Sequence, residues 1–501
     1  MTTIKLVIIS IYLKLLYYFR ALVSQSETTY KILFAPGYES SRFRIGNWRA
    51  WRAYKLARKN TPAYKKFLEG KEVRIRVPGL DVDLSSVPIM DKESYIKKFS
   101  IEERCVDGKI PTTGVVIDES SGTSGTANNW VRGTGERHAV KFALQTAIHY
   151  LIGDKPIFFI NAFALGPWAT GMNVSMSVVD IAILKSVGPD AQKVINTLKF
   201  FGPKYNYIIS GYPPFLKGLV DSTEINWSDY NIIAFYGGEG ISEPARDYLL
   251  KAFSKVYGSY GASDLEINIA AENDFTIGLR NAAMKNPALS KALFRHGGVP
   301  MIFQYNPFDY YIETNDEGEL IVTLCRPTNV QPKIRYNIHD LGHVVRVPEL
   351  KKILHGARMQ ISDIGKLEAD LPLLFHYGRS DQSVAFYGCK ITPAEIETII
   401  FSKEELAPHI NTFALVVSED DKLNKKLELA LELKEGAVNT LDENAMTKQI
   451  FDALKEANQD FRESSRMIPA GNEPHVKMYA FGTGPFAGND IRLKKRYIQH
   501  A

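Results

Sequence analysis

The run Ser120-Ser121-Gly122-Thr123-Ser124-Gly125-Thr126 is the part of the sequence best suited to binding an anion. It follows GVVIDE, a segment typical of a β-strand, and it combines glycines with hydroxyl side chains. Glycines let backbone N–H groups converge on an anion, and hydroxyls add donors for phosphate oxygens. Because runs of this composition also form plain turns, the segment alone indicates a phosphate site without establishing one.

Further segments with glycines and charged or aromatic side chains follow in a fixed order. Taken singly, Asp340 is more typical of a turn or cap, Arg379 of a surface ion pair, and the Lys-Lys-Arg triplet at 494–496 of an exposed tail. Only their joint order suggests a common site. The segments are Gly237-Gly238-Glu239, Tyr257–Asp264, Ile334–Gly342, Gly378–Asp381, Gly388 before a Pro-Ala-Glu-Ile-Glu helix start, and Ile491–Ile498.

Together these segments resemble the motifs of the adenylate-forming superfamily, which includes acyl- and aryl-CoA synthetases, nonribosomal adenylation domains and luciferases. The resemblance covers about residues 45–501 and is specific for the superfamily, not for a substrate. Trp48, Trp51, NTPAY (60–64) and NAFALGPWATGMN (161–173) look most like the phenylacetate–CoA ligase branch, including its capsule-synthesis relatives. The implied cofactors are ATP and Mg²⁺, with CoA as a second substrate.

The resemblance implies that Ser120, Ser121, Gly122, Thr123, Ser124 and Gly125 hold the β- and γ-phosphates of ATP. Family members commonly have Pro-Lys shortly after this loop, whereas this chain has Ala127-Asn128. Arg132 or Arg137 could supply the missing cation. The other implied nucleotide contacts are Gly237, Gly238, Glu239, Ser259, Tyr260, Gly261, Ala262, Asp340 at the ribose and Arg379, with Ser263 near the α-phosphate.

The same resemblance implies a Mg²⁺ ligand, a catalytic lysine and a hinge for the small domain. Asp264 stands where the family has a Mg²⁺-binding Glu, and Glu266 is the alternative. Lys494 or Lys495 matches the adenylation lysine on the C-terminal segment. Asp381 matches the hinge about which the small domain rotates, and Gly388 lies on the face used in the second step.

The segment around Phe163, Trp168 and Gly171 resembles the acyl-pocket lining of that branch. With Tyr236 it would form a flat aromatic slot for an aryl or short aryl-alkyl acid. His138, His149 and His376 lack ligand spacing and are expected to be structural.

The implied reaction is ATP-dependent activation of this carboxylic acid to an acyl-adenylate, with release of pyrophosphate and transfer to CoA. An amine or a carrier protein is the alternative acceptor. A non-catalytic relative or a peripheral membrane protein in polysaccharide assembly is the alternative from a different class, favoured by the absent Pro-Lys and the basic N-terminus.

The elements that must position these residues can be read from hydrophobic periodicity. Strand and helix patterns alternate from residue 157 to 260, which predicts an α/β fold with a mostly parallel, helix-covered sheet. Asn315–Gly318 is a hairpin signal inside an expected antiparallel or barrel-like subregion. The predicted organisation is an N-terminal extension at 1–44, a large domain at 45–381 and a small C-terminal domain at 382–501. The small domain is expected to be mobile and to mix helices and strands (α/β, in an α+β arrangement).

The amino-acid composition argues against several other classes of protein and of site. In 501 residues, 45% hydrophobic content excludes a disordered chain, and 61 Lys and Arg against 56 Asp and Glu give no argument for nucleic-acid binding. The three cysteines are widely separated, so neither a disulfide framework nor a cysteine metal site is expected. A reducing, cytoplasmic location fits this cysteine usage.

The N-terminus is basic and apolar. Residues 1–76 contain 16 Lys and Arg against four Glu, and the apolar stretch 4–23 is interrupted by Lys5, Lys14 and Arg20. A helix packed on the protein, an amphipathic helix at the membrane surface and a membrane span are the three alternatives. We predict that residues 1–24 bind anionic bilayers reversibly.

Overall fold

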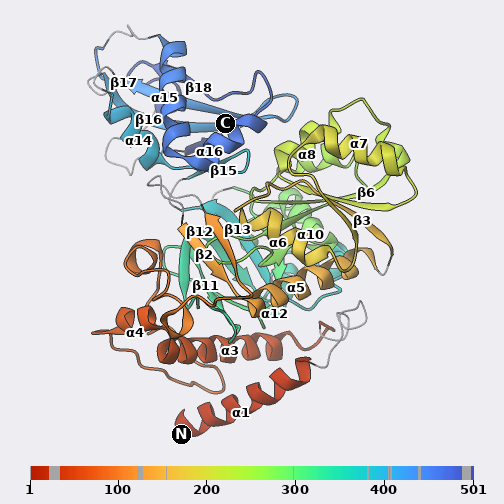
Figure 1. The fold of residues 1–501 in the computed structure, drawn as a ribbon, viewed down its shortest axis with the longest axis vertical. Coiled ribbons are helices and arrows are strands. Elements are labelled where there is room, and N and C mark those ends of the chain that lie inside the picture. Colours follow the sequence, from red (N-terminus) through yellow and green to blue (C-terminus); the bar gives the residue numbers. More distant parts are fainter. Residues whose placement is uncertain are drawn as a thin grey trace.

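The chain folds into a large domain with a smaller C-terminal domain at one end and a long N-terminal helix at the other (Figure 1). The coordinates are a computed structural model. They describe residues 2–21, 34–120, 128–153, 155–296, 298–380, 383–403, 406, 409–437, 442–487 and 498–500.

Eleven strands of the described residues form one sheet in the order β10-β11-β12-β13-β9-β8-β7-β6-β5-β3-β4. The strands from β4 to β7 run parallel, as the alternation of strands and helices predicts. All five residues of β3 are buried, which is expected of a parallel strand covered on both faces. The parallel strands are β3 (Ile157–Asn161), β4 (Ile183–Ser186), β5 (Asn206–Gly211), β6 (Asn231–Gly237) and β7 (Lys255–Tyr260).

Helices connect and cover these strands, with local signals marking their starts. Asp190 and Ser242 accept hydrogen bonds from backbone N–H groups at the N-termini of α7 and α9 and so cap these helices. The helices of this domain are α5 (Thr134–Ile152), α6 (Ala169–Val178), α7 (Ala191–Phe201), α8 (Pro213–Val220), α9 (Glu243–Leu249), α10 (Asp274–Lys285), α11 (Pro287–Leu293), α12 (Val347–Gly356) and α13 (Ile361–Ile364).

The predicted antiparallel region is present, and the turn of its hairpin contains Gly318 at φ +81°. It does not stand apart as a barrel, because β8 pairs with both β7 and β9 and so continues the parallel sheet. Its strands are β8 (Ala270–Ala271), β9 (Met301–Tyr305), β10 (Tyr310–Thr314), β11 (Glu319–Leu324), β12 (Tyr336–Val345) and β13 (Leu373–Arg379). β1 (Val116–Ser120) and β2 (Asn128–Arg132) form a separate antiparallel pair.

The small domain has its own sheet, ordered β18-β17-β16-β19, and its own hydrophobic core. The helix start expected at Pro-Ala-Glu-Ile-Glu is confirmed, and Thr392 and Glu395 exchange hydrogen bonds there in a capping box at the start of α14. Its elements are β14 (Val384–Phe386), β15 (Cys389–Ile391), α14 (Pro393–Phe401), β16 (Ile410–Glu419), β17 (Lys425–Leu433), α15 (Glu443–Ala457), α16 (Gln459–Ser464), β18 (His475–Tyr479) and β19 (Ile498–His500).

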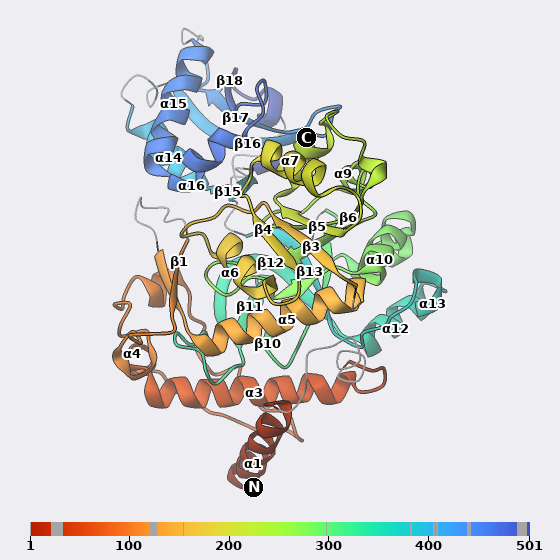
Figure 2. The same ribbon diagram turned by 45° about the vertical axis from the view of Figure 1, so that its right-hand side comes forward.

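Two long helices form the opposite end of the molecule. α3 (Glu39–Asn60) buries Trp51, Tyr54 and Ala57, and α4 (Pro62–Leu68) follows it. α1 (Thr2–Ala21) lies on the outer side of α3 (Figure 2). Within the described part of the chain, no helix is long and apolar enough to cross a membrane. α3 runs across position 44/45, so the first predicted boundary lies inside a helix. The predicted domain boundaries at 44/45 and 381/382 both remain predictions.

Candidate active site

A cavity of about 1260 Å³ lies between the large sheet and the small domain. Most of the site residues predicted from the sequence line this cavity. Its volume is larger than that of a typical small-ligand pocket. The predicted residues that line it are Phe163, Trp168, Tyr236, Gly237, Gly238, Glu239, Ser259, Tyr260, Gly261, Ala262, Ser263, Asp264, Asp340 and Arg379, together with Gly388 of the small domain.

Parallel strands explain why distant segments meet here. Gly237 and Ser259 are paired at the carboxyl ends of β6 and β7, the edge at which open α/β sheets bind ligands. The turn after β7 is tight, because a Cβ at Gly261 would lie 2.7 Å from the carbonyl oxygen of Glu266. Residues 259–264 therefore line the cavity as one compact segment.

Asp340 is an ionised acceptor on this lining, although it is only 5% exposed. The Tyr260 hydroxyl donates to its Oδ2 at 2.7 Å, while His376 Nε2 is 3.5 Å from Oδ2 and Arg379 is 3.4 Å from Oδ1. Burial would raise the pKa of Asp340, but the hydrogen bond and charge of His376 and the charge of Arg379 hold this pKa well below its usual range. An ionised carboxylate of this kind can accept two hydrogen bonds from a diol.

His376 belongs to this group, although no motif of the sequence predicts it there, and its interpretation as a structural residue stays a prediction. Its ring lies 4.8 Å from the Tyr260 ring, centroid to centroid, and it lines the cavity. The signal that could have found it is its position on β13, three residues before Arg379.

Glu319 holds the segment that carries Asp340 through contacts with neighbouring residues. Its carboxylate accepts hydrogen bonds from Asn337 (2.6 Å) and Ser380, and His339 Nδ1 lies 3.1 Å from it. Burial opposes ionisation, yet the hydrogen bonds from Ser380, Asn337 and His339 lower the pKa of Glu319 to about 2. This one carboxylate therefore joins β12 to the end of β13, next to the predicted hinge.

Asp264 has different partners. The Tyr336 hydroxyl (3.1 Å) and Lys92 Nζ (3.3 Å) both contact its Oδ2. Burial raises the pKa of Asp264, but the charges of Lys92, Lys390 and Lys333 outweigh burial and lower it. The side chain is thus ionised, and a cation would have to bind through Oδ1.

The lining of the cavity suits a Mg²⁺ ion that is bound mainly by the phosphates of the nucleotide. The described residues contain no group of three or more His, Cys, Asp or Glu that could hold a metal. Mg²⁺ commonly uses one carboxylate together with substrate phosphates, which Asp264 can satisfy. The alternative ligand, Glu266, is 3% exposed, contacts Arg326 and the Tyr310 hydroxyl through Oε2, and is not among the residues that line the cavity, so its role stays a prediction.

The two arginines considered as replacements for the missing lysine have other contacts. Arg132 binds Asp118 (3.2 Å) and donates to the carbonyls of Leu265 (2.5 Å) and Ser263, so it fixes the turn that carries Asp264. Arg137 donates to the carbonyl of Gly114. The lysines that line the cavity are instead Lys92 and, from the small domain, Lys390 and Lys425.

The small domain closes the cavity through the β14–β15 hairpin. The Gly388 N–H donates to Glu239 Oε1 at 2.5 Å, and Lys425 forms an ion pair with Oε2 of the same carboxylate. Lys390, two residues after Gly388, extends into the cavity, where burial and Arg379 lower its pKa while Asp340 and Asp264 favour its charged form. Glu239, expected at the adenine, therefore joins the two domains in this arrangement.

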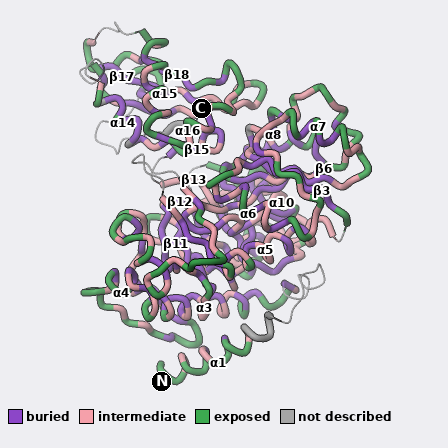
Figure 3. The backbone as a smooth tube through the Cα atoms, in the orientation of Figure 1, coloured by how far each residue is buried: buried purple, intermediate pink, exposed green. Residues whose placement is uncertain are grey.

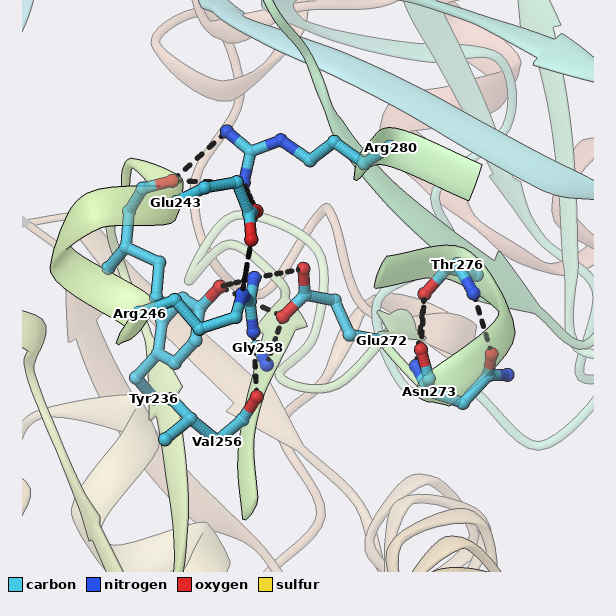
Figure 4. Close-up of polar contacts among 10 residues, drawn as sticks. Tyr236, Glu243, Arg246, Val256, Gly258, Glu272, Asn273, Thr276 and Arg280 are labelled. Atoms are coloured by element: carbon cyan, nitrogen blue, oxygen red, sulfur yellow. Dashed lines mark hydrogen bonds and ion pairs between the residues drawn. The ribbon is translucent and has the colours of Figure 1, made fainter. Parts of the chain in front are cut away.

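Aromatic side chains are among the residues that line the cavity, and their assignment to an acyl slot stays a prediction. Phe163 packs edge to face on Tyr212 at 5.3 Å, with Phe235 and Trp168 nearby in the lining. The hydroxyl of Tyr236 binds Glu272 (2.9 Å) and Arg246 (3.2 Å) in a buried cluster (Figure 4).

Gly171 is not among the lining residues, because a Cβ there would lie 2.0 Å from the carbonyl oxygen of Ala164. Its role is this close packing of α6 on the preceding loop.

Several predicted residues lie outside the described parts of the chain. They are Ser121, Gly122, Thr123, Ser124 and Gly125, together with Asp381, Lys494 and Lys495. Ser120 ends β1 opposite Asn128, so the predicted strand before the loop is confirmed. The roles of these residues remain predictions.

No protein-family model matches the chain, and no match is found among curated proteins. Solved structures do match. A 2-hydroxyisobutyryl-CoA ligase in complex with 2-HIB-AMP and CoA in the thioesterification state is 15% identical at a TM-score of 0.61, over 93% of this chain and 91% of that one. The same ligase in the postadenylation state, with 2-HIB-AMP, is 14% identical at a TM-score of 0.52 over the same shares.

From the topology, the cavity at the domain junction and these matches, the chain has the fold of the adenylate-forming enzymes, with a large N-terminal and a small C-terminal domain.

Proposed function

We propose that the protein is an AMP-forming ligase, which activates a carboxylic acid with ATP and transfers the acyl group to CoA. The observation that carries the proposal is Asp340, an ionised carboxylate surrounded by Tyr260, His376 and Arg379 in a cavity at the carboxyl ends of parallel strands. This group suits the hydroxyls of a ribose, and the glycine-rich edge beside it suits the flat face of a base.

The first step joins two anions, because an acid carboxylate attacks the α-phosphate of ATP. Charge must therefore be neutralised along the cavity. Lys92, on the large domain beside Asp264, offers a fixed cation, and the predicted adenylation lysine, Lys494 or Lys495, offers a mobile one. Mg²⁺, when bound with ATP through Asp264, would supply further positive charge to the phosphates.

The second step transfers the acyl group and releases AMP. Gly388 and Lys390 line the cavity, and Lys390 is placed to neutralise charge on the departing phosphate. CoA is the proposed acceptor, with an amine or a carrier protein as alternatives that use the same acyl-adenylate.

The acid is proposed to be aryl or aryl-alkyl. Phe163, Trp168, Tyr212 and Phe235 all line the cavity, and Phe163 packs edge to face on Tyr212, which supports an aromatic surface for the acid. The three cysteines are free and buried, which supports work in a reducing, cytoplasmic compartment.

The test is acid-dependent release of pyrophosphate from ATP and Mg²⁺ across a panel of aryl, aryl-alkyl and aliphatic carboxylic acids. CoA is then added to ask whether a thioester forms. We expect release with an aryl or aryl-alkyl acid, and in Asp340→Asn we expect release only at higher ATP concentrations. A protein that neither releases pyrophosphate nor binds ATP or AMP would instead be a non-catalytic relative.

A further inference from the structure

The outer face of α1 is apolar although the helix is already packed on the protein. Ile9 and Leu13 are 4% and 2% exposed, and Tyr12 packs edge to face on Trp48 of α3 at 5.7 Å. Lys5 fixes the N-terminal turn by donating to the carbonyl of Gly79 at 2.7 Å. Packing on the protein therefore uses one side of α1 only.

The other side carries five large apolar residues. At 100° per residue they fall within one stripe, and their spacing of three and four residues is that of a single helix face. In Figure 3 much of α1 is coloured as exposed, in contrast to α3 beside it. The stripe consists of Ile4, Val7, Ile8, Ile11 and Leu15, which are 66%, 53%, 61%, 56% and 66% exposed.

The surroundings of this stripe are strongly basic. Lys14 is exposed at its edge, and α3, α4 and the following loop expose further bases. Residues 1–76 contain 16 Lys and Arg against four Glu, whereas the rest of the chain is acidic on balance. The exposed bases of this region are Lys55, Arg58, Lys59, Lys65, Lys66, Lys71, Arg74 and Arg76, of which Lys66 and Arg74 form ion pairs with Glu103 and Glu72.

These observations decide between possible partners. A second copy of the chain would bring one basic region against another, which charge repulsion opposes. An anionic lipid surface offers both an apolar interior for the stripe and negative head groups for the bases. We propose that the outer face of α1 docks the protein on anionic membrane, with the helix lying in the interface while its inner face stays packed on α3.

The packed-helix and surface-helix interpretations of the N-terminus are then two sides of one element. The contact does not require the helix to span the membrane. Salt should weaken it, since its electrostatic part acts between exposed charges.

The test is co-sedimentation of the full-length protein with vesicles of phosphatidylglycerol and phosphatidylcholine, compared with phosphatidylcholine alone. We expect binding to the anionic vesicles that falls as salt is raised. Ile8→Gln/Ile11→Gln removes apolar surface without adding charge and should lower binding at least about tenfold. The matched control is Val179→Gln/Phe200→Gln, which changes two exposed apolar residues elsewhere and should bind as the unaltered protein does.

Circular dichroism and the elution volume are measured on every variant, so that loss of binding is separated from unfolding. If Ile8→Gln/Ile11→Gln does not fold, the single variant Ile11→Gln replaces it. Equal binding of the stripe variant and the control overturns the proposal. It is also overturned if the unaltered protein ignores anionic vesicles, or if it forms a dimer that the stripe variant abolishes, because a second copy would then cover the face.

Discussion

Asp340 and Asp264 lie in the same cavity but are held by different residues, and this difference predicts different roles. Asp340→Asn should weaken binding of ATP and of AMP by about 10- to 100-fold, because hydrogen bonds to a charged group contribute roughly 1.5–3 kcal/mol. Asp264→Asn should bind AMP almost normally, but it should react slowly and depend differently on Mg²⁺.

Calorimetric titration with AMP and rate measurements across Mg²⁺ concentrations separate the two variants. Asp316→Asn, on the exposed hairpin, serves as the control. Identical profiles for the Asp340 and Asp264 variants would show that the two roles are not divided in this way.

Lys390 and the C-terminal lysines are expected to act in opposite half-reactions. Lys390→Ala should slow transfer from pre-made acyl-adenylate to CoA about tenfold or more and leave pyrophosphate release nearly unchanged, with partial rescue by Lys390→Arg. Lys494→Ala, or failing that Lys495→Ala, should abolish adenylate formation and spare transfer. Single-turnover assays of each half-reaction check this, with Lys422→Ala as an exposed control on the small domain.

The residues that could be predicted from the sequence lie in short segments whose local composition is distinctive, such as Tyr260 among glycines. Lys92, Glu319 and Lys390 could not, because only the tertiary fold brings them near these segments, whereas His376 lies on the same strand as Arg379. Tyr236 lines the cavity, but its hydroxyl binds Glu272 and Arg246, and its place in an acyl slot stays a prediction. Successive residues of a strand face opposite sides, so Phe235 and Tyr236 point in opposite directions.

At the scale of elements, Glu319 ties β11 and β12 to the end of β13. Its folded-state pKa of about 2 lies below the usual value, so its stabilising effect is complete above about pH 5 and is lost as pH falls toward 2. Glu319→Gln should therefore lower the free energy of unfolding at neutral pH by roughly 1–3 kcal/mol, and by less as the pH is lowered.

Urea unfolding across that pH range tests this prediction, with Glu317→Gln in the exposed turn of the same hairpin as control. A stability difference that does not change with pH would contradict the assigned ionisation.

The contact between β6 and the small domain depends on Glu239, whose side chain is 1% exposed and paired with Lys425. Glu239→Gln keeps an acceptor for the Gly388 N–H but removes the ion pair, so other domain arrangements should become more populated. We expect slower acyl transfer and a changed X-ray scattering profile. Glu419→Gln, which alters the exposed contact with Ser242 at the same junction, should have little effect on either.

Elements with strong local periodicity were predictable, including β5, α7 and the β10–β11 hairpin. The continuity of the sheet was not, since it rests on Ala270 and Ala271 of β8, a strand too short to leave a pattern. The expectation of a separate barrel-like subregion failed at that point.

At the scale of the whole molecule, the core of the small domain is built only from residues 384–478 in the described chain, apart from the main core. Calorimetry should therefore resolve two unfolding transitions. AMP, which is expected to bind chiefly the large domain, should raise the midpoint of that transition by a few degrees and leave the other nearly unchanged. One cooperative transition that AMP shifts as a unit would show that the domains unfold together.

The long helix α1 and the small domain occupy opposite ends of the molecule (Figure 1). A protein resting on a flat support through α1 would carry its small domain on the side facing away from that support. The turnover cycle would then change the height of the bound layer, while the residence time on the support would be the same with and without substrate. Reflectivity from a supported film can measure both quantities in one sample.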